Sequence, residues 1–480
     1  MYALNMKVIL LILLLFGVWL APLVWVNRDS QKKGLRTEVW NSLICFLGLI
    51  GLGIYFFARW RGNLALVQSS REVEEKQKVL VSSSPTERVE ELRLFRRDGE
   101  QVRAARGRRK HQWQTGAIDE IRQIILRALD DRATDIHLES MEGGLRVRYR
   151  IDGILHIEQE YSHQSLSRSI ISAVKVMAGI DVAEKRKAQD GSFRSCLGES
   201  RVDFRVSSSS TMYGETLVIR VLDRERGLVP LNRLGLSAGM LDHTRSILQC
   251  SQGLILVTGP TGCGKTTTLY TLLRQLNAVE KNIITVEDPI EYELPGITQI
   301  SVHPKAGITF ANGLRSMLRQ DPDVLMVGEI RDEETAGLAV QSALTGHLVF
   351  STVHANDAVG TIARLRSMKI EPEMIASALA VVIAQRLVRK VCQNCKAIES
   401  SVPVAVGCER CKGTGYHGRT GIFEMLLLNK KLKSCIETSG EIEAIRQAAV
   451  EAGMRTMQED GIAKVKQSIT TREEVLRVMR

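Results

Sequence analysis

The chain has 480 residues, of which 44% are hydrophobic and 25% are charged, and its formal net charge at neutral pH is +11. This length and apolar content suffice for two or three folded domains and exclude a wholly disordered chain. Nine cysteines are too few for a disulfide scaffold, so a reducing compartment is expected. The positive charge favours an acidic partner, either anionic lipid, nucleic acid or nucleotide.

Residues 1–60 contain two apolar stretches without a charge, at 8–26 and 39–58. Each is about long enough to cross a hydrocarbon core of roughly 30 Å, so we expect a membrane anchor with two transmembrane helices. A signal peptide is the alternative for the first stretch, although its apolar part is long and Ala21-Pro22 is a poor cleavage site.

The basic residues around these stretches give two conflicting indications of topology. The positive-inside rule keeps the loop 28–38 in the cytoplasm, whereas a helical hairpin places it outside. Residues 93–110 contain eight Lys/Arg and place the following domains in the cytoplasm. Either the hairpin tolerates a basic outer loop, or the second stretch, with Gly48, Gly51 and Gly53, does not span fully. The hairpin is our preferred interpretation.

Three segments follow the anchor. Residues 61–114 are polar and basic and are expected to form a juxtamembrane linker, which is either solvated or bound to lipid headgroups. Nucleic-acid binding is not expected there, because Trp113 is the only nearby stacking ring. Residues 115–229 combine helical spacing at 118–129 and 170–180 with strands at 145–151, 202–206 and 216–222, which predicts an α+β domain. Residues 230–390 alternate helical stretches with apolar runs at 254–258, 283–286, 324–327 and 348–352, which predicts a parallel sheet in an α/β domain.

A phosphate-binding loop follows the first of these runs, because Leu254–Thr258 leads directly into a Walker A motif and a helical stretch. The glycines let backbone N–H groups face the phosphates of ATP. Lys265 reaches the β- and γ-phosphates, and the Thr266 hydroxyl group is a magnesium ligand. The predicted nucleotide-binding residues are Gly259, Pro260, Thr261, Gly262, Cys263, Gly264, Lys265, Thr266 and Thr267.

Two acidic clusters and a histidine follow later strands, where phosphoryl transfer needs carboxylates. The first cluster is Glu287-Asp-Pro-Ile-Glu291. In the second, Gly328 occupies the place of the usual Walker B aspartate and Glu329 comes next. Because the C-terminal ends of parallel strands border the nucleotide crevice, we expect these carboxylates beside the phosphates. His354 follows the strand at 348–352 and is a candidate contact to the γ-phosphate.

From about residue 115 to its end, the chain resembles the secretion ATPases of type II secretion and type IV pilus assembly. The strings that carry the resemblance are Asp135-Ile-His-Leu-Glu139, Arg148-Tyr-Arg-Ile-Asp-Gly153, the Walker A loop, Thr285-Val-Glu-Asp-Pro-Ile-Glu291, Arg319-Gln-Asp-Pro-Asp323, Gly328-Glu-Ile-Arg-Asp332 and Thr345-Gly-His347 through His354. The resemblance implies a RecA-like P-loop ATPase domain, preceded by the small α+β domain and assembled as a homo-hexamer.

The resemblance also implies roles for single residues. Glu291 is the expected water-activating base, Glu329 the Walker B carboxylate and His354 the γ-phosphate sensor, although which glutamate is the base stays open. Arg205 and Arg220 match arginines of the small domain that clamp the nucleotide.

This chain departs from the family pattern at two places. It has Gln189-Asp-Gly-Ser192 where relatives have arginine last, so that contact is either missing or moved to Arg194. Membrane segments also stand in place of the N-terminal recruitment domain of many relatives.

Cys392, Cys395, Cys408 and Cys411 form two C-x-x-C pairs with the spacing of a zinc ribbon. Four thiolates fill the tetrahedral shell of Zn²⁺, so we expect a structural site within residues 391–422, followed by a helical region at 423–480. The isolated cysteines at 45, 196, 250, 263 and 435 are expected to be structural. By resemblance, a tetracysteine segment is typical of assembly and secretion ATPases and is missing from retraction ATPases.

The sequence thus predicts an ATP- and Mg²⁺-dependent motor at the bacterial inner membrane, with its ATPase domains in the cytoplasm. It would act on an inner-membrane platform protein to drive type II secretion or pilus assembly. A DNA-uptake or DNA-transport motor is the alternative, and salt-dependent DNA binding that stimulates hydrolysis would favour it. A nucleotide-gated membrane adaptor with little turnover is a third hypothesis.

Overall fold

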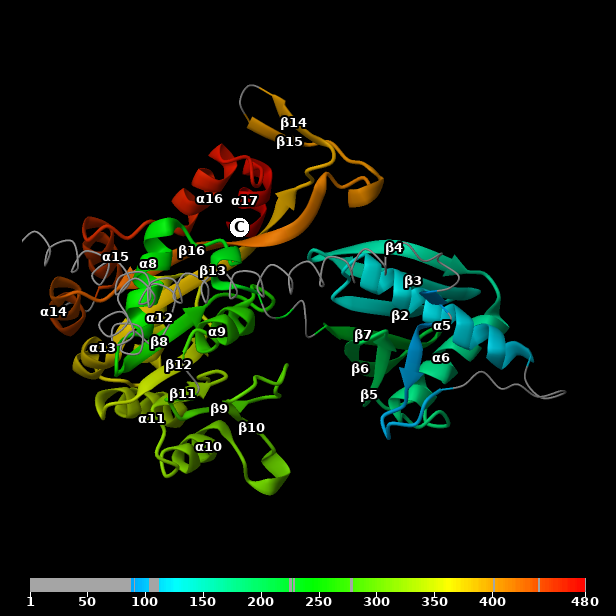
Figure 1. Cartoon of the computed structure of the whole chain (residues 1–480), viewed down its shortest axis with the longest axis horizontal. Helices are drawn as coiled ribbons and strands as arrows, with labels where there is room; N and C mark the ends of the chain where they lie inside the picture. Colours follow the sequence, from blue (N-terminus) through cyan, green and yellow to red (C-terminus); the bar gives the residue numbers. More distant parts are fainter. Residues whose placement is uncertain are drawn as a thin grey trace, which may run out of the picture. The chain divides into compact units, whose positions relative to one another are not determined.

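The computed structural model of the chain describes residues 88–89, 91–102, 112–223, 227, 229–276, 279–399, 402–438 and 441–479 (Figure 1). Both predicted transmembrane stretches and most of the predicted linker lie outside these residues. Within the described part of the chain, no helix combines the length and apolar character needed to span a membrane.

The first sheet is antiparallel throughout, with strand order β1-β5-β6-β7-β2-β3-β4 (Figure 1). Two helices, α5 and α6, pack together beside it. The elements are β1 (Arg93–Phe95), α5 (Gln112–Asp130), β2 (Asp135–Met141), β3 (Gly144–Ile151), β4 (Ile154–Tyr161), α6 (Gln164–Ala178), β5 (Gln189–Leu197), β6 (Ser200–Thr211) and β7 (Gly214–Asp223).

Alternation of side chains explains this small domain. On β3, Leu145, Val147 and Tyr149 are fully buried, while the arginines between them are only partly buried. The Tyr149 hydroxyl group donates a hydrogen bond of 2.6 Å to the carbonyl oxygen of Ile124 in α5, which fixes the helix on the sheet. The strand predicted at 145–151 is confirmed.

The second sheet has the order β10-β9-β11-β12-β8-β13-β16, and all neighbours are parallel except β13 and β16. Its elements up to β13 are η1 (Leu231–Arg233), α8 (Ala238–Leu248), β8 (Gly253–Thr258), α9 (Lys265–Leu273), β9 (Ile283–Glu287), β10 (Thr298–Ser301), η2 (Pro304–Ala306), α10 (Phe310–Met317), β11 (Val324–Val327), α11 (Glu333–Leu344), β12 (Leu348–Val353), α12 (Ala358–Ser367), α13 (Pro372–Ala378) and β13 (Leu379–Val391).

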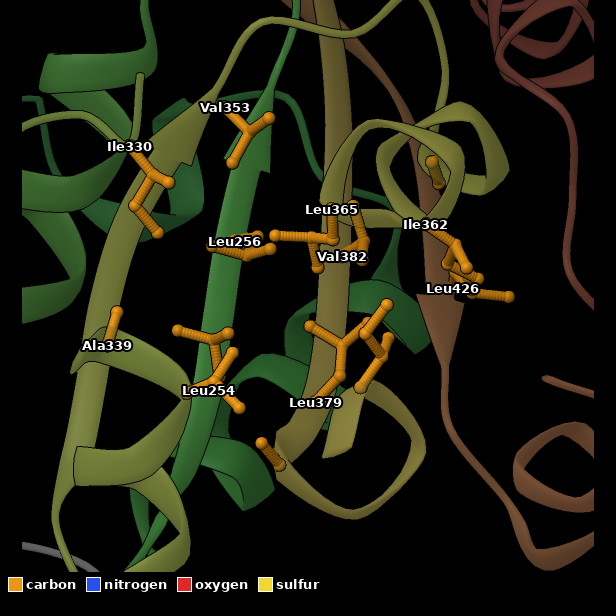
Figure 2. Packing of buried hydrophobic residues seen from close by; sticks show 14 of the residues in the cluster. Leu254, Leu256, Ile330, Ala339, Val353, Ile362, Leu365, Leu379, Val382 and Leu426 are labelled. Atoms are coloured by element: carbon orange, nitrogen blue, oxygen red, sulfur yellow. The ribbon is translucent and has the colours of Figure 1, made fainter. Parts of the chain in front are cut away.

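Helices cover both faces of this sheet, which is why its central strands β8, β9, β11 and β12 are buried at every position and mostly apolar. On β8, Leu254 and Leu256 pack in one cluster with α10 to α13 and the C-terminal helices, whereas Ile255 and Val257 pack in another with α8 and α9. Figure 2 shows the first cluster, in which labelled side chains of α12 and β13 gather around β8. The four apolar runs predicted as strands are therefore confirmed as β8, β9, β11 and β12.

The cysteine-containing segment is inserted between β13 and β16, which are hydrogen-bonded neighbours in the sheet. The boundary predicted after residue 422 thus falls inside β16. The remaining elements are β14 (Lys396–Glu399), β15 (Val402–Ala405), η3 (Glu409–Cys411), β16 (Tyr416–Leu427), α14 (Lys430–Thr438), α15 (Ile442–Glu451), α16 (Met457–Lys466) and α17 (Arg472–Met479).

Two elements differ from the sequence-based expectation. The helix predicted at 170–180 begins at Gln164 and ends before Gly179, whose φ of 69° is left-handed and closes the helix. The predicted linker contains β1, which pairs with β5 because Leu92 and Leu94 bury their side chains completely.

Candidate active site

The Walker A loop connects β8, an interior strand of the parallel sheet, to the first turn of α9. Gly264 caps α9 with a left-handed φ of 89°, which a side chain would strain. Gly259 has φ of 146°, and a Cβ atom there would lie 2.5 Å from the carbonyl oxygen of Gln385. Glycine at both positions therefore lets the backbone turn sharply and expose its N–H groups at the helix N-terminus.

Gln385 on β13 holds this loop from the neighbouring strand, a role that the sequence analysis did not anticipate. Its side-chain amide donates to the carbonyl oxygen of Cys263 at 2.7 Å and accepts from the Thr268 hydroxyl group at 2.8 Å. Gln385 is buried, so these bonds form away from competing water. A polar residue directly after the apolar run 379–384 was the available signal in the sequence.

Lys265 begins α9 and folds over the loop. Its ammonium group donates hydrogen bonds to the carbonyl oxygens of Gly259 at 2.9 Å and Pro260 at 3.1 Å. Burial lowers the pKa of Lys265, while the thiol of Cys263 and the carboxylate of Glu329 act against this shift. The loop thus carries a positive charge next to exposed backbone at Thr261 and Gly262 and the exposed side chain of Thr266.

Glu329 and His354 meet at the same edge of the sheet, beyond the C-terminal ends of β11 and β12. The Nε2 atom of His354 lies 3.6 Å from Oε2 of Glu329, and Arg331 donates to the other carboxylate oxygen at 2.5 Å. The Glu329 side chain is 16% exposed, so its charge is partly shielded from water.

The glycine at position 328 has a packing reason. A Cβ atom at Gly328 would lie 3.3 Å from the carbonyl oxygen of Val286 and 3.4 Å from the ring of Phe310. Both approaches are tighter than usual side-chain contacts, so the aspartate common at this position would force its neighbours to shift. Glu329 is the first position after β11 where a carboxylate fits without this conflict.

The acidic cluster after β9 divides into an inner and an outer carboxylate. Glu287 is 3% exposed and is hydrogen-bonded within the domain by Tyr270, Thr285 and Gln299. Glu291 is instead 30% exposed in its side chain and accepts a hydrogen bond of 3.3 Å from Arg205. Of these two glutamates, Glu291 is the one whose carboxylate is available to a ligand.

Arg205 and Arg220 lie directly opposite each other on β6 and β7. Arg205 reaches the ATPase domain, because its second amino group also donates to the carbonyl oxygen of Ile290 at 3.1 Å. Arg220 is 62% exposed and donates to Asp135 on β2 at 3.3 Å. The structure thus brings Arg205 to the loop that contains Glu291. Asp135 holds the side chain of Arg220, which lies beside Arg205 on the neighbouring strand.

Ser192 is the register partner of Arg205 on β5, and Arg194 lies two residues further along the same strand. The guanidinium group of Arg194 donates a hydrogen bond of 2.7 Å to Asp203 on β6. Arg194, the alternative position for the contact that is missing at Ser192, is therefore bound to a carboxylate of the small domain.

A cavity of 460 Å³ flanks the phosphate loop. Gly264 and Thr267 line it from α9, and Thr134, Val221 and Asp223 line it from the small domain. Its volume is within the range of small-molecule sites.

The four cysteines of the two C-x-x-C pairs come together, as the spacing predicts. All their sulfur atoms lie within 4.8 Å of one another. The Sγ atoms of Cys392 and Cys408 are 3.9 Å apart, those of Cys395 and Cys411 3.8 Å, and those of Cys408 and Cys411 3.7 Å. A tetrahedral ion with zinc–sulfur bonds of about 2.3 Å requires sulfur separations of about 3.8 Å, so the cluster fits Zn²⁺.

Backbone groups favour the thiolate form at this cluster. Burial alone raises the pKa of the Cys411 thiol, but the N–H groups of Cys408 and Gly415 donate to its sulfur at 3.1 and 3.2 Å and bring the pKa down to about 6. Such donors to a ligating sulfur are typical of structural zinc sites.

The cysteine cluster also contacts the small domain. Lys412, next to Cys411, places its ammonium group 2.5 Å from a carboxylate oxygen of Asp131 and 2.6 Å from one of Glu158. The N–H of Gly418 donates to Asp152 at 2.7 Å. These hydrogen bonds connect the segment that runs from the cysteine cluster into β16 with the small domain.

We expect purified protein to contain about one zinc ion per chain, because four sulfur atoms fill its coordination shell. Cys411→Ser should reduce the zinc content toward zero and lower the melting temperature, both measurable by metal analysis and calorimetry. Cys435→Ser is the matched control, since Cys435 is free and outside the cluster. Freshly reduced wild-type protein without zinc would contradict this assignment.

Comparisons with known proteins identify the family of this chain. A family model described as type II/IV secretion system protein matches residues 113–477. The chain is 46% identical over 360 residues to the type II secretion system protein HxcR of Pseudomonas aeruginosa. The aligned region covers 75% of this chain and 76% of HxcR. It is 42% identical over 470 residues to the type IV pilus assembly ATPase PilB of Thermus thermophilus, covering 94% of this chain and 50% of that protein. A crystal structure of the pilus retraction motor PilT with bound ADP is similar with a TM-score of 0.54 and 29% identity, covering 74% of this chain and 95% of that one.

Proposed function

Because the chain belongs to the type II/IV secretion system protein family and is an ATPase, we propose that it is the hexameric motor of a type II secretion system or a type IV pilus. The observation that carries this proposal is the Walker A loop at the start of α9, where the charge of Glu329 acts on Lys265. PilT, a motor that binds ADP, provides a structural parallel for the nucleotide.

We assign the residues of this site by what each side chain can do. Lys265 and the N-terminus of α9 bind the phosphates, and the Thr266 hydroxyl group and Glu329 hold Mg²⁺, directly or through water. Glu291 orients and deprotonates the attacking water, because its carboxylate is partly exposed and is held in place by Arg205. His354 senses the γ-phosphate beside Glu329.

Arg205 explains how hydrolysis could move the small domain. It belongs to β6 but binds both the side chain and the neighbouring backbone of the Glu291 loop. Loss of the γ-phosphate changes the charge that this arginine and Arg220 experience, so the two domains would change their contact with each turnover. A planar guanidinium group with several donors suits this task better than lysine.

We further propose that residues 1–60 anchor each subunit in the inner membrane, with the ATPase domains in the cytoplasm. Two uncharged stretches of this length would expose a large apolar surface on a soluble ring. Six subunits would bring about twelve helices to one assembly, and this valency would hold the motor at its platform protein.

Deleting residues 1–60 should give a soluble chain that still forms hexamers and hydrolyses ATP but no longer supports secretion or pilus assembly. Phosphate release, sedimentation and an export assay in cells measure these three properties. As a control, the full-length protein should stay in the membrane fraction after washes with high salt and carbonate. Release by these washes would refute the membrane anchor and would leave the basic linker as the attachment. Hydrolysis that depends on added DNA would instead refute the proposed motor function.

A further inference from the structure

Tyr270 is a fully buried residue on the helix that follows the phosphate loop. It lies four residues after Thr266, so the two side chains leave α9 on the same face. Its ring packs edge-on against Tyr292, with 5.9 Å between the ring centroids and an angle of 77° between the planes. Tyr270 therefore connects the helix that binds phosphate to the loop that follows β9.

The hydroxyl group of Tyr270 makes two hydrogen bonds of opposite direction. It donates to Oε2 of Glu287, and it accepts from the backbone N–H of Glu291 at 3.3 Å. Burial raises the pKa of Tyr270, and the negative charge of Glu287 raises it further, so the hydroxyl group keeps its proton. A carboxylate can only accept hydrogen bonds, so the hydroxyl proton of Tyr270 points to Glu287. A lone pair of the hydroxyl oxygen then remains to accept from the backbone N–H of Glu291.

Glu287 holds the hydroxyl group in this orientation because its own position is fixed. Its other oxygen, Oε1, accepts hydrogen bonds from Thr285 at 2.6 Å and from Gln299 at 3.0 Å. The side chain of Gln299 also binds the carbonyl oxygen of Tyr292 and the N–H of Leu294. The buried carboxylate thus has separate partners for each oxygen, and only Oε2 faces Tyr270.

We propose that Tyr270 is a positioning residue for ATP hydrolysis, which holds the backbone of Glu291 at a fixed place relative to the phosphate-binding helix. Arg205 binds the side chain of the same glutamate, so Glu291 is held at both ends. The inference rests on the proposed role of Glu291. It adds that the groups binding phosphate and the group activating water are connected through one buried hydroxyl group.

Two substitutions in the full-length chain test this connection. Tyr270→Phe removes the hydroxyl group and keeps the ring. Glu287→Gln keeps the hydroxyl group but reverses its hydrogen bond, because the amide oxygen is needed by Thr285 and Gln299, and the NH₂ group then faces Tyr270. Both variants should lower kcat by about tenfold or more while KM for ATP changes less than about twofold, since a small misplacement of a reacting group acts on the chemical step.

Matched controls separate positioning from general destabilisation. Tyr149→Phe removes an equally buried hydroxyl group in the small domain, away from Glu287 and Glu291. It should keep kcat within about twofold of wild type. In addition, Tyr270→Phe combined with Glu291→Gln should be no slower than Glu291→Gln alone, because the two residues act in one step.

The inference requires that both test substitutions lower kcat and that Tyr149→Phe does not. It is overturned if either test variant hydrolyses ATP at the wild-type rate, or if Tyr149→Phe is as slow as Tyr270→Phe. Failure of the proposed role of Glu291 would look different, since then Glu291→Gln itself would leave hydrolysis unchanged.

Discussion

Lys265→Ala is expected to reduce ATP hydrolysis to below about 1% of the wild-type rate, because one preorganised donor to developing phosphate charge contributes on the order of 10²–10³ in rate. In this structure the ammonium group binds only the carbonyl oxygens of Gly259 and Pro260 within the protein. Its loss should therefore change the free energy of unfolding by only about 1 kcal/mol. Phosphate release measures the first effect and denaturant unfolding the second.

The matched control for this variant is Lys305→Ala. Lys305 is an exposed lysine in η2 and has the same charge. The Lys305→Ala variant should hydrolyse ATP at the wild-type rate. This result would show that a change of net charge alone has no effect on hydrolysis. Turnover above about a tenth of wild type in Lys265→Ala would contradict the assignment of the phosphate loop as the site of hydrolysis.

Glu291→Gln and Glu329→Gln are each expected to lower kcat by about 10²-fold or more, but for different reasons. The substitution keeps the shape of the side chain and removes its charge. At Glu291 it removes the base, so nucleotide and Mg²⁺ binding should stay near wild type. At Glu329 it weakens the metal site, so the Mg²⁺ concentration for half-maximal activity should also rise.

Titration of activity against Mg²⁺, together with binding of a fluorescent ATP analogue, distinguishes the two glutamates. Glu293→Gln is the control, because Glu293 is an exposed carboxylate on the loop of Glu291. If Glu291→Gln retains activity, while Glu329→Gln loses hydrolysis but keeps its affinity for Mg²⁺, then Glu329 is the base. That outcome would leave Glu291 as a partner of Arg205 alone.

The local elements of the ATPase domain could be predicted from the sequence, because each carries its signal within a few residues. The runs that became β8, β9, β11 and β12 are apolar at nearly every position, as strands covered on both faces must be. Glycine spacing identified the phosphate loop, and cysteine spacing identified the metal cluster. In these cases the chemistry depends on residues that are near in sequence.

Only the tertiary structure decided which distant groups meet. Arg205 is separated from Glu291 by 86 residues, and Gln385 from Cys263 by 122, and no periodicity relates either pair. From residue types alone, Glu287 and Glu291 are both carboxylates after a strand, and it was the resemblance that favoured Glu291. The fold distinguishes them, because Tyr270, Thr285 and Gln299 enclose the first while the second faces the small domain. Long-range hydrogen bonds between buried groups depend on how strands and helices pack, and a linear pattern of residue types contains no record of that packing.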